Sequence, residues 1–354
     1  MNVLSLFDGM SCGQIALNRL GIKYDNYYAS EIDKYAIQVT QKNYPNTKQI
    51  GDVTKIKGED LPKIDLLIGG SPCQGFSFAG KRLNFEDPRS KLFFEYVRLL
   101  NELKPKYFLL ENVKMKKESQ DVISKYLGVE PIKINSNLLS AQNRSRLYWT
   151  NIGVITKNNL FGFTQPGIEQ PIDKGILLKD IIVEGLSSLG LAQRGRYNKE
   201  KKIIQKYELN GSEKSNALTT VSKDTLLFIP IDKHNSKVGL ICLGGIAKSK
   251  LRLNDGKVLQ RNFTQGNRVY SIKGKSATLS AIGGGLGGNS GLYDVEGVIR
   301  KLTPMECERL QTVPDNYTEG VSNTRRYHML GNGWTVDVIC HIFKNMEFLK
   351  KKIN

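Results

Sequence analysis

Short apolar runs alternate with segments of helical spacing over the first part of the chain. Five apolar runs of strand length end at residues typical of turns: 3–7, 27–30, 64–68, 107–110 and 147–152. Helical spacing of apolar residues occurs between them, over 13–20, 34–42 and 90–103. Such alternation is typical of a parallel sheet buried between helices. We therefore expect an α/β fold with a doubly wound, mostly parallel sheet.

The alternation stops near residue 158, and helical spacing returns only at 303–310 and 336–349. The interval is rich in Gly, Asn, Ser and Thr, with short β-like pieces such as 225–229 and 269–272. A flexible linker is the simpler interpretation, but the interval is long and regularly dotted with apolar triplets. We predict a large domain formed by 1–159 and 299–354, with its last helix beside its first. A smaller β-rich domain at 160–298 is inserted into it.

Two pieces of this interval, 215–220 and 275–280, resemble each other. Each follows a basic, strand-like run that contains tyrosine. The similarity indicates either a weak internal duplication or chance.

The charge of the chain favours a polyanionic partner. The sequence has 52 Lys and Arg against 34 Asp and Glu, a formal charge of +18. Residues 194–275 alone have 18 basic and 6 acidic residues and carry +12 of this surplus. Lys and Arg that meet phosphates release condensed counterions, so we expect nucleic acid in preference to the alternative that the charge serves solubility alone.

Cysteine usage and hydropathy indicate a cytosolic protein. The five cysteines are odd in number and form no CxxC pair, so neither a disulfide framework nor a zinc site is expected. The N-terminus lacks the basic and apolar regions of a signal peptide. No segment approaches the roughly 20 apolar residues of a membrane span.

Polar residues follow the predicted strands where a parallel sheet binds ligands. The turn at 7–13 is built of small residues, which let backbone amides approach a ligand at a helix N-terminus, although a plain tight turn would look the same. Glu31 ends the second strand and Asp52 follows Gly51 in a later loop. Each acid alone is more typical of a cap or an exposed side chain. Together they suit an adenosine lying across the carboxyl ends of the sheet.

A cysteine and an acid follow the next two strands. Cys73 lies in a glycine-flanked, polar loop, where a thiolate would be a strong nucleophile; a buried structural thiol is the alternative. Glu111 ends the adjacent strand and could protonate a ring nitrogen, or could cap a helix. Residues 78–89 lack periodicity and suit a loop that closes over a substrate.

Two arginines at alternate positions precede the strand at 147–152. In an extended chain Arg144 and Arg146 point to the same side. Paired guanidinium groups suit a phosphate or a carbonyl oxygen. A solvated basic face is the alternative.

The ordered motifs together resemble those of bacterial and phage DNA (cytosine-5-)methyltransferases. Spread over nearly the whole chain outside the basic interval, they are Phe7-Asp8-Gly9, Pro72-Cys73-Gln74, Asp87-Pro88-Arg89, Glu111-Asn112-Val113, Gln142-Asn143-Arg144-Ser145-Arg146, Arg300-Lys301-Leu302-Thr303-Pro304 with Glu306, Arg309, Leu310 and Gln311, and Gly331-Asn332-Gly333. Two departures are Cys12 in the first glycine loop and Trp334 after the last motif. Neither removes a catalytic group.

The resemblance implies a Rossmann-like S-adenosyl-L-methionine-dependent methyltransferase whose inserted domain recognises the target. It implies that Cys73 attacks carbon 6 of a flipped-out cytosine while Glu111 holds N3, and that Arg144 and Arg146 hold the base oxygen and a phosphate. The implied cofactor contacts are Phe7, Asp8, Gly9, Gly13, Glu31, Ile32, Asp52, Pro72, Leu92 and Asn332. No metal is implied. The implied partner is double-stranded DNA. The resemblance further implies that the protein acts as a monomer in the cytoplasm of a prokaryotic or phage-infected cell. A cognate restriction endonuclease for the same site is a possible second component.

Three other functions are compatible with parts of the sequence. The same chemistry on RNA is disfavoured by the long basic insertion. A catalytically inactive binding module is disfavoured because Cys73 and Glu111 are both present. An NAD-dependent oxidoreductase is disfavoured because no GxGxxG motif occurs.

Overall fold

The computed structural model describes most of the chain. The described residues are 1–71, 88–153, 155–158, 163–183, 194–197, 203–206, 226–235, 239–248, 265–281, 287–288, 290–295 and 298–347. Pro72 and Cys73 lie outside them, as do the first repeated piece at 215–220 and the predicted closing loop except its last two positions.

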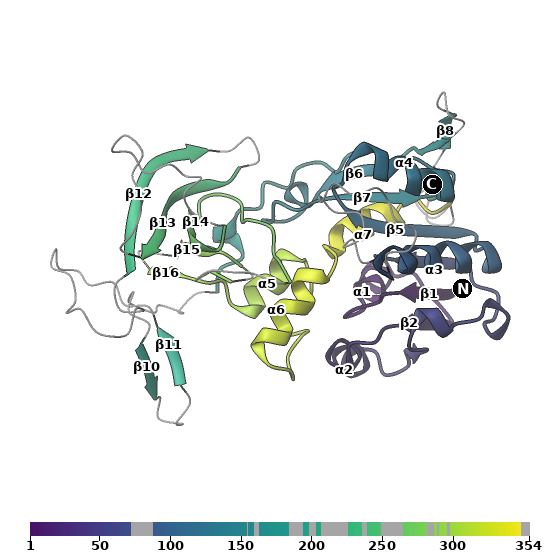
Figure 1. The fold of residues 1–354 in the computed structure, drawn as a ribbon, viewed down its shortest axis with the longest axis horizontal. Helices are drawn as coiled ribbons and strands as arrows, with labels where there is room; N and C mark the ends of the chain where they lie inside the picture. Colours follow the sequence, from purple (N-terminus) through teal and green to yellow (C-terminus); the bar gives the residue numbers. More distant parts are fainter. Residues whose placement is uncertain are drawn as a thin grey trace.

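A seven-stranded sheet forms one half of the molecule (Figure 1). Its strands are β1 (Asn2–Leu6), β2 (Asn26–Ser30), β3 (Lys48–Gln49), β4 (Leu66–Gly69), β5 (Tyr107–Val113), β6 (Ile132–Asn135) and β7 (Ser145–Thr150), in the order β3-β2-β1-β4-β5-β7-β6. The strands from β3 to β5 in this order are parallel, whereas β7 runs antiparallel to both neighbours. The sheet is thus mostly parallel, as predicted, and its antiparallel strand β7 follows β6 without a helical crossover.

Helices cover both faces of this sheet because successive strand residues point to opposite sides. In β5, Tyr107 and Leu109 belong to the core shared with α1 (Cys12–Arg19), α2 (Lys34–Asn43) and α7 (Val336–Phe343). Phe108 and Leu110 belong to the opposite core, under α3 (Pro88–Leu103) and α4 (Lys117–Leu127). The strands are thus buried on both sides, as their uninterrupted apolar runs predicted.

The last helix packs beside the first, as predicted. The Cys340 thiol donates to the Ala16 carbonyl at 3.6 Å, and Arg19 pairs with Asp337 at 2.5 Å. However, α7 ends at Phe343, earlier than the predicted residue 349. Its last turn is closed by Asn345, whose amide donates to the His341 carbonyl at 3.0 Å and competes with continuation of the helix.

A second sheet lies at the other end of the molecule, with α5 (Pro304–Leu310) and α6 (Asn323–Asn332) between the two sheets (Figure 1). Its strands are β12 (Leu226–Asn235), β13 (Ile241–Lys248), β14 (Arg268–Ser271), β15 (Leu292–Val295) and β16 (Val298–Arg300). Neighbours are antiparallel except β14 and β15. Short hairpins form from β8 (Ile155–Asn158) with β9 (Thr164–Pro166), and from β10 (Arg194–Tyr197) with β11 (Ile203–Lys206). The domain boundaries at 159/160 and 298/299 stay predictions. Strand β16 runs across the second boundary, so the chain has no break in secondary structure there.

The buried carboxylate of Glu306 links the start of α5 to the predicted inserted domain. Glu306 completes a capping box with Thr303, accepts two hydrogen bonds from Arg300 at 2.8 Å, and accepts the Val183 amide at 3.1 Å. Burial opposes ionisation, but the bonds from Arg300 and Thr303 hold the pKa of Glu306 below its ordinary value. Since Val183 belongs to the predicted inserted domain, this cluster positions that domain on α5.

Replacing Glu306 by alanine is expected to lower the free energy of unfolding by about 3–5 kcal/mol, because Arg300 would be left as a mostly buried, unpaired cation. Denaturant titration at neutral pH measures this. Because the folded-state pKa is depressed, the stabilisation exists above the ordinary carboxyl pKa and fades as the pH falls through the folded value. A difference from wild type under about 1 kcal/mol at pH 7, or one that grows in acid, would contradict this role.

Candidate active site

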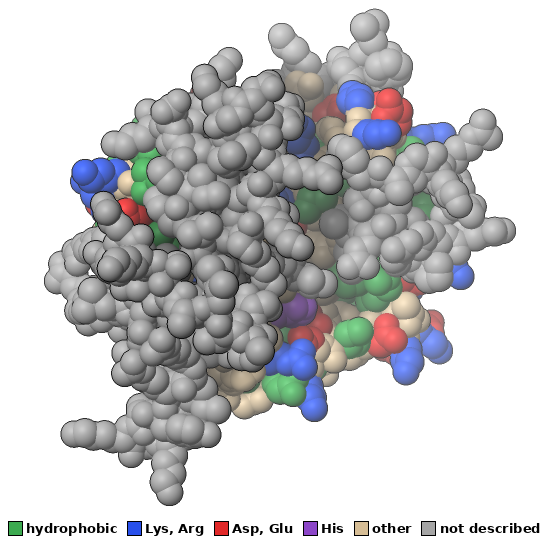
Figure 2. Space-filling model, turned by 60° about the vertical axis from the view of Figure 1, so that its left-hand side comes forward, with side chains coloured by type: hydrophobic (Ala, Val, Ile, Leu, Met, Phe, Trp, Pro, Cys, Tyr) green, Lys and Arg blue, Asp and Glu red, His purple; other side chains and the backbone are tan. Residues whose placement is uncertain are grey.

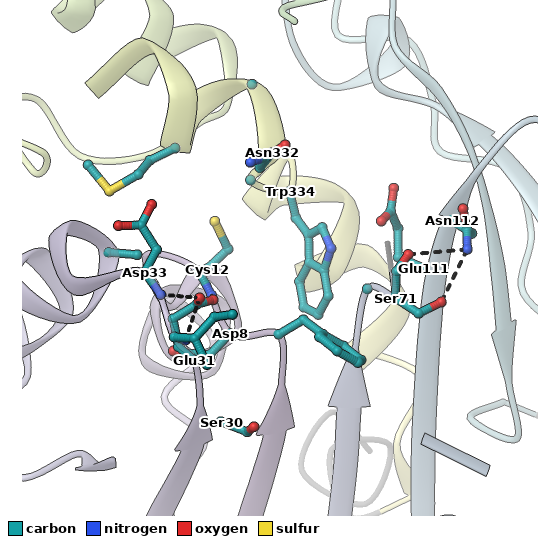
Figure 3. Close-up of a pocket in the computed structure, with 18 of the residues that line it drawn as sticks. Asp8, Cys12, Ser30, Glu31, Asp33, Ser71, Glu111, Asn112, Asn332 and Trp334 are labelled. Carbon is teal, nitrogen blue, oxygen red and sulfur yellow. Dashed lines mark hydrogen bonds between the residues drawn. The ribbon is translucent and has the colours of Figure 1, made fainter. Parts of the chain in front are cut away.

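A pocket of about 490 Å³ opens at the carboxyl ends of β1, β2, β4 and β5 (Figure 3). The chain winds away from β1 toward β3 on one side and from β4 toward β6 on the other, so β1 and β4 meet at the switch point of the sheet. Crevices at such points are where α/β proteins bind ligands, and this volume suits a nucleotide-sized molecule.

The turn after β1 shapes one wall of the pocket. Phe7, Gly9 and Ser11 all have positive φ, at 57°, 59° and 65°. For Phe7 and Ser11 this backbone is unfavourable, and such strain concentrates at ligand sites. Phe7 and Gly9 line the pocket. Gly13 does not, although we expected it to touch the cofactor; a side chain there would overlap Ile68 and Tyr27, so this glycine lets α1 pack on the sheet.

Glu31 holds the neighbouring loop in place. One carboxylate oxygen accepts the Gly9 amide at 2.7 Å, and the other accepts the amides of Ile32 and Asp33 at 2.7 and 2.8 Å. The loop therefore presents Ile32, 78% exposed, at the pocket, while Asp33 caps α2 through the Tyr35 amide. An exposed apolar side chain in such a pocket suits the flat face of a base.

Asp52 and Leu92, two of the predicted cofactor contacts, complete this side of the pocket. Asp52 caps the short 3₁₀ helix Val53–Lys55, and hydrogen bonds from Thr54 lower its carboxyl pKa. Both Asp52 and Leu92, from α3, line the pocket. An ionised, partly exposed acid here can accept hydrogen bonds from a ligand.

Asp8 is a buried carboxylate with spare hydrogen-bonding capacity at the pocket. Burial raises its pKa to about 6, although the nearby hydroxyls of Ser5, Tyr27 and Ser11 oppose this. One oxygen accepts the Tyr27 hydroxyl at 2.8 Å, and the other has no partner among the described residues. A desolvated anion of this kind attracts a cationic ligand group.

Replacing Asp8 by asparagine is expected to stabilise the free protein at neutral pH by about 1–3 kcal/mol, because ionising the buried acid opposes folding. The folded pKa lies above the unfolded value, so this group favours folding most below about pH 4, and the benefit is lost as the pH rises to about 6. Denaturant unfolding at pH 4.5 and 7.5 tests this. Equal stability of both proteins at pH 7.5 would contradict it.

Glu111 and Arg146 form the opposite wall. Arg146 Nε lies 3.0 Å from Glu111 Oε1, and the two side chains are only 14% and 10% exposed. Asn112 donates to the Ser71 carbonyl and hydroxyl at 3.4 and 3.3 Å, which ties the end of β5 to the residue just before Pro72. A Cβ on Gly70 would lie 3.2 Å from Glu111 Oε2, so the chain entering the Cys73 loop passes beside this acid.

Arg144 lines the pocket, as does Arg146. The residue is 3% exposed, and its guanidinium donates to the carbonyls of Leu279, Gly331 and Gly333. A direct contact with the base stays a prediction, while the bonds present are to the protein itself.

The third wall was largely missed from the sequence. His328, Met329 and Gly333 line the pocket together with the predicted Asn332. Helix α6 is mostly polar, so the spacing of its few apolar residues did not predict a helix. The Gly-Asn-Gly motif at its end was the only sequence feature that pointed to this wall. The Trp334 indole stands between the Asp8–Glu31 group and the Ser71–Glu111 group (Figure 3).

The described cysteines are not candidates for nucleophilic chemistry in this pocket. Cys12, Cys242, Cys307 and Cys340 are buried, and only Cys12 among them lines the pocket. Burial raises the Cys12 pKa to about 12, so its thiol stays neutral at physiological pH.

Within the described part of the chain no group of His, Cys, Asp and Glu could hold a metal ion. No described helix is long and apolar enough to cross a bilayer.

The fold and the pocket together define a Rossmann-like α/β enzyme of the methyltransferase class. The family model for C-5 cytosine-specific DNA methylases matches residues 1–347. The chain therefore belongs to this family, and it is a DNA cytosine-5 methyltransferase, as the motifs predicted.

Named relatives agree with this membership. The orphan methyltransferase M.Rho11sI of Bacillus phage rho11s is 35% identical over 84% of this chain, which spans 61% of that protein's length. The type II methyltransferase M.HhaI of Haemophilus parahaemolyticus is 29% identical, with 98% of this chain and 94% of that protein aligned. The S. pombe Dnmt2 methyltransferase structure has a TM-score of 0.60 over 100% of this chain and 99% of that one; at 17% identity it shows a shared fold alone.

Proposed function

We propose that this enzyme methylates carbon 5 of cytosines within a specific sequence of double-stranded DNA, using S-adenosyl-L-methionine. The observation that supports this best is the Glu111–Arg146 pair at the end of β5, facing the cofactor-sized pocket and adjoining the chain that enters the Cys73 loop. It combines a carboxyl group and a cation beside the chain that leads to Cys73, and Cys73 would add the thiol that cytosine activation also requires.

The residues of the pocket suit S-adenosyl-L-methionine. Ile32 can cover a base, Glu31 and Asp52 offer carboxylate oxygens for hydroxyl and amino groups, and the unpartnered Asp8 oxygen offers a negative charge for a cationic group. When bound, this cofactor would supply an electrophilic methyl group. Asn332 and Pro72 are further contacts that the family motifs imply.

The chain's own residues would carry the covalent steps. The Cys73 thiolate attacks carbon 6 of a cytosine rotated out of the duplex, since its ring face is inaccessible within the stack. Glu111 holds N3 and delivers a proton there as electron density moves into the ring. After carbon 5 is methylated, loss of its proton expels the thiolate and restores the aromatic ring.

Arg146 would stabilise this arrangement electrostatically. Its guanidinium already fixes the orientation of Glu111 through Nε, and Nη1 donates to the Ser145 carbonyl at 3.0 Å, which leaves Nη2 for a base oxygen or a phosphate. We therefore assign it to substrate binding, with Glu111 as its neighbour.

The inserted region would read the DNA target in the major groove. Most of the basic surplus lies there. On the described face of the other half, by contrast, Lys and Arg side chains are interspersed with Asp and Glu (Figure 2). Action as a monomer in the cytoplasm, with or without a restriction endonuclease for the same site, completes the proposal.

Bisulfite sequencing of DNA from cells that express the protein tests this function. We expect protected cytosines at carbon 5 within one recurring sequence, and none in cells expressing a Cys73→Ala variant. Transfer of labelled methyl groups to purified DNA and to tRNA provides the second arm. Label in tRNA alone would contradict the DNA substrate.

A further inference from the structure

The segment 275–281 belongs by position to the predicted recognition domain, but it is bonded to the catalytic half. It follows β14, a strand of the second sheet. The Ser276 amide donates to the Ala141 carbonyl at 2.8 Å, and the Asn143 amide donates to the Ser276 carbonyl at 3.1 Å. The Thr278 hydroxyl donates to the Asn143 carbonyl at 2.6 Å. The segment therefore lies beside the chain that leads to Arg144.

Arg144 connects this segment to the turn after α6. Its Nη1 donates to the Leu279 carbonyl at 3.2 Å, and its Nη2 donates to the carbonyls of Gly331 and Gly333 at 3.0 Å each. Those two glycines flank Asn332, and all three line the pocket. One guanidinium thus holds the recognition-side segment and a cofactor wall at once.

Backbone packing reinforces this connection. A Cβ on Gly331 would overlap the backbone of Ser280 and Ala281, so the segment and the turn lie in direct contact. The Gln311 amide holds the same turn from the other side, at 2.6 Å from the Leu330 carbonyl and 3.1 Å from that of Gly333. A displacement of residue 279 therefore reaches the pocket through Arg144 and Gly331 rather than being absorbed by loose packing.

We propose that Arg144 is a positioning residue that couples DNA binding in the recognition region to cofactor binding in the pocket. This inference rests on the proposed function, and it gives Arg144 a role through Leu279, Gly331 and Gly333 rather than through the base. Coupling of this kind is reciprocal: DNA tightens cofactor binding by the same factor by which the cofactor tightens DNA binding.

The chemistry of arginine fits this role. Three carbonyls in different directions require a planar fork of donors, which a lysine ammonium on a flexible stem does not reproduce. Burial lowers the pKa of Arg144 to about 10, yet the group remains a cation at neutral pH and makes charge-assisted bonds. Arg144→Lys keeps the positive charge but removes the planar set of donors that reaches the three carbonyls.

Calorimetry with S-adenosylhomocysteine tests the coupling. Its Kd is measured with and without a saturating amount of sheared bacterial DNA. A bacterial genome is long enough to contain every short recognition sequence, and DNA that lacks cytosine methylation presents these sequences unmodified. We expect DNA to lower the wild-type Kd roughly 5- to 150-fold, the usual range of coupling, and to change it less than twofold in Arg144→Lys. A ratio near one in wild type, or an unchanged ratio in the variant, would overturn the proposal.

Arg98→Lys is the matched control. Arg98 also donates to backbone carbonyls, those of the pocket-lining Val53 and of Ile56, but among the described residues none of its bonds reaches the recognition side. This variant is expected to weaken S-adenosylhomocysteine equally with and without DNA, so that the ratio is retained. If both variants lose the ratio, general loosening of the pocket is responsible and the specific role of Arg144 is refuted.

Hydrogen exchange of the wild-type protein tests the same connection without any variant, should Arg144→Lys fail to fold. Adding S-adenosylhomocysteine should slow amide exchange within 275–281, which does not line the pocket. Unchanged exchange there, alongside slowed exchange at the turn around Asn332, contradicts the coupling. Failure of the wild-type protein to bind S-adenosylhomocysteine at all would instead contradict the proposed function.

Discussion

Alanine at position 73 is expected to eliminate methyl transfer, lowering kcat by roughly 10⁴-fold or more, the scale on which loss of a covalent nucleophile acts in other enzymes. The pocket itself should be unaffected, since its described walls are built from other residues. Binding of S-adenosylhomocysteine and of DNA should therefore stay within a few fold of wild type. Radiolabel transfer and equilibrium binding on the same preparation measure the two effects.

Cys12→Ala is the matched control for this prediction. It removes the cysteine that the structure places in the pocket lining, whose thiol is kept neutral by burial. We expect this variant to keep methyl transfer within about an order of magnitude of wild type, because no step uses this sulfur. Loss of activity in Cys12→Ala with retention in Cys73→Ala would reverse the assignment of the nucleophile.

Glu111→Gln is expected to lower kcat by about 10²- to 10⁴-fold, the usual contribution of a general acid. The amide can still accept a hydrogen bond from Arg146, so the ion-pair geometry at 3.0 Å should be largely kept while the transferable proton is lost. Stability and S-adenosylhomocysteine binding are expected to change little. Single-turnover kinetics distinguishes a slower chemical step from weaker binding.

A carboxylate of similar pairing but different location provides the comparison. Asp315 pairs with Arg309 at 2.6 Å at the surface, and neither lines the pocket. Asp315→Asn should leave turnover within about twofold, as surface ion pairs contribute little. A comparable kcat for Glu111→Gln and Asp315→Asn would show that Glu111 has no role in proton transfer.

The site followed well from the sequence wherever strand ends are involved. Glu31 and Asp52 follow strands of the sheet and Glu111 lies in the last part of β5, and parallel strands carry such residues to one edge. This is a geometric consequence of the fold, so local spacing was sufficient to group them. The pocket wall at Phe7 and Gly9 was predictable for the same reason.

The features of the fold and site that the sequence did not predict depend on contacts between segments distant in sequence. The reversal of β7 and the clamp made by Arg144 arise from pairing with residues remote in sequence, Leu279 and Gly331 among them. The receiving groups are backbone carbonyls, which every residue has, so no side-chain pattern marks them. Helix α6 was missed because its polar surface leaves few apolar positions to space.

We propose that the sulfur of Cys73 bonds to the target base during turnover. DNA in which cytosine is replaced by 5-fluorocytosine tests this bond directly, because fluorine cannot be lost as a proton and the adduct persists. We expect a denaturation-resistant protein–DNA complex whose digested peptide carries the modified base on Cys73. Efficient methylation of ordinary DNA with no trapped complex, or a base attached to any other residue, would refute covalent catalysis by Cys73.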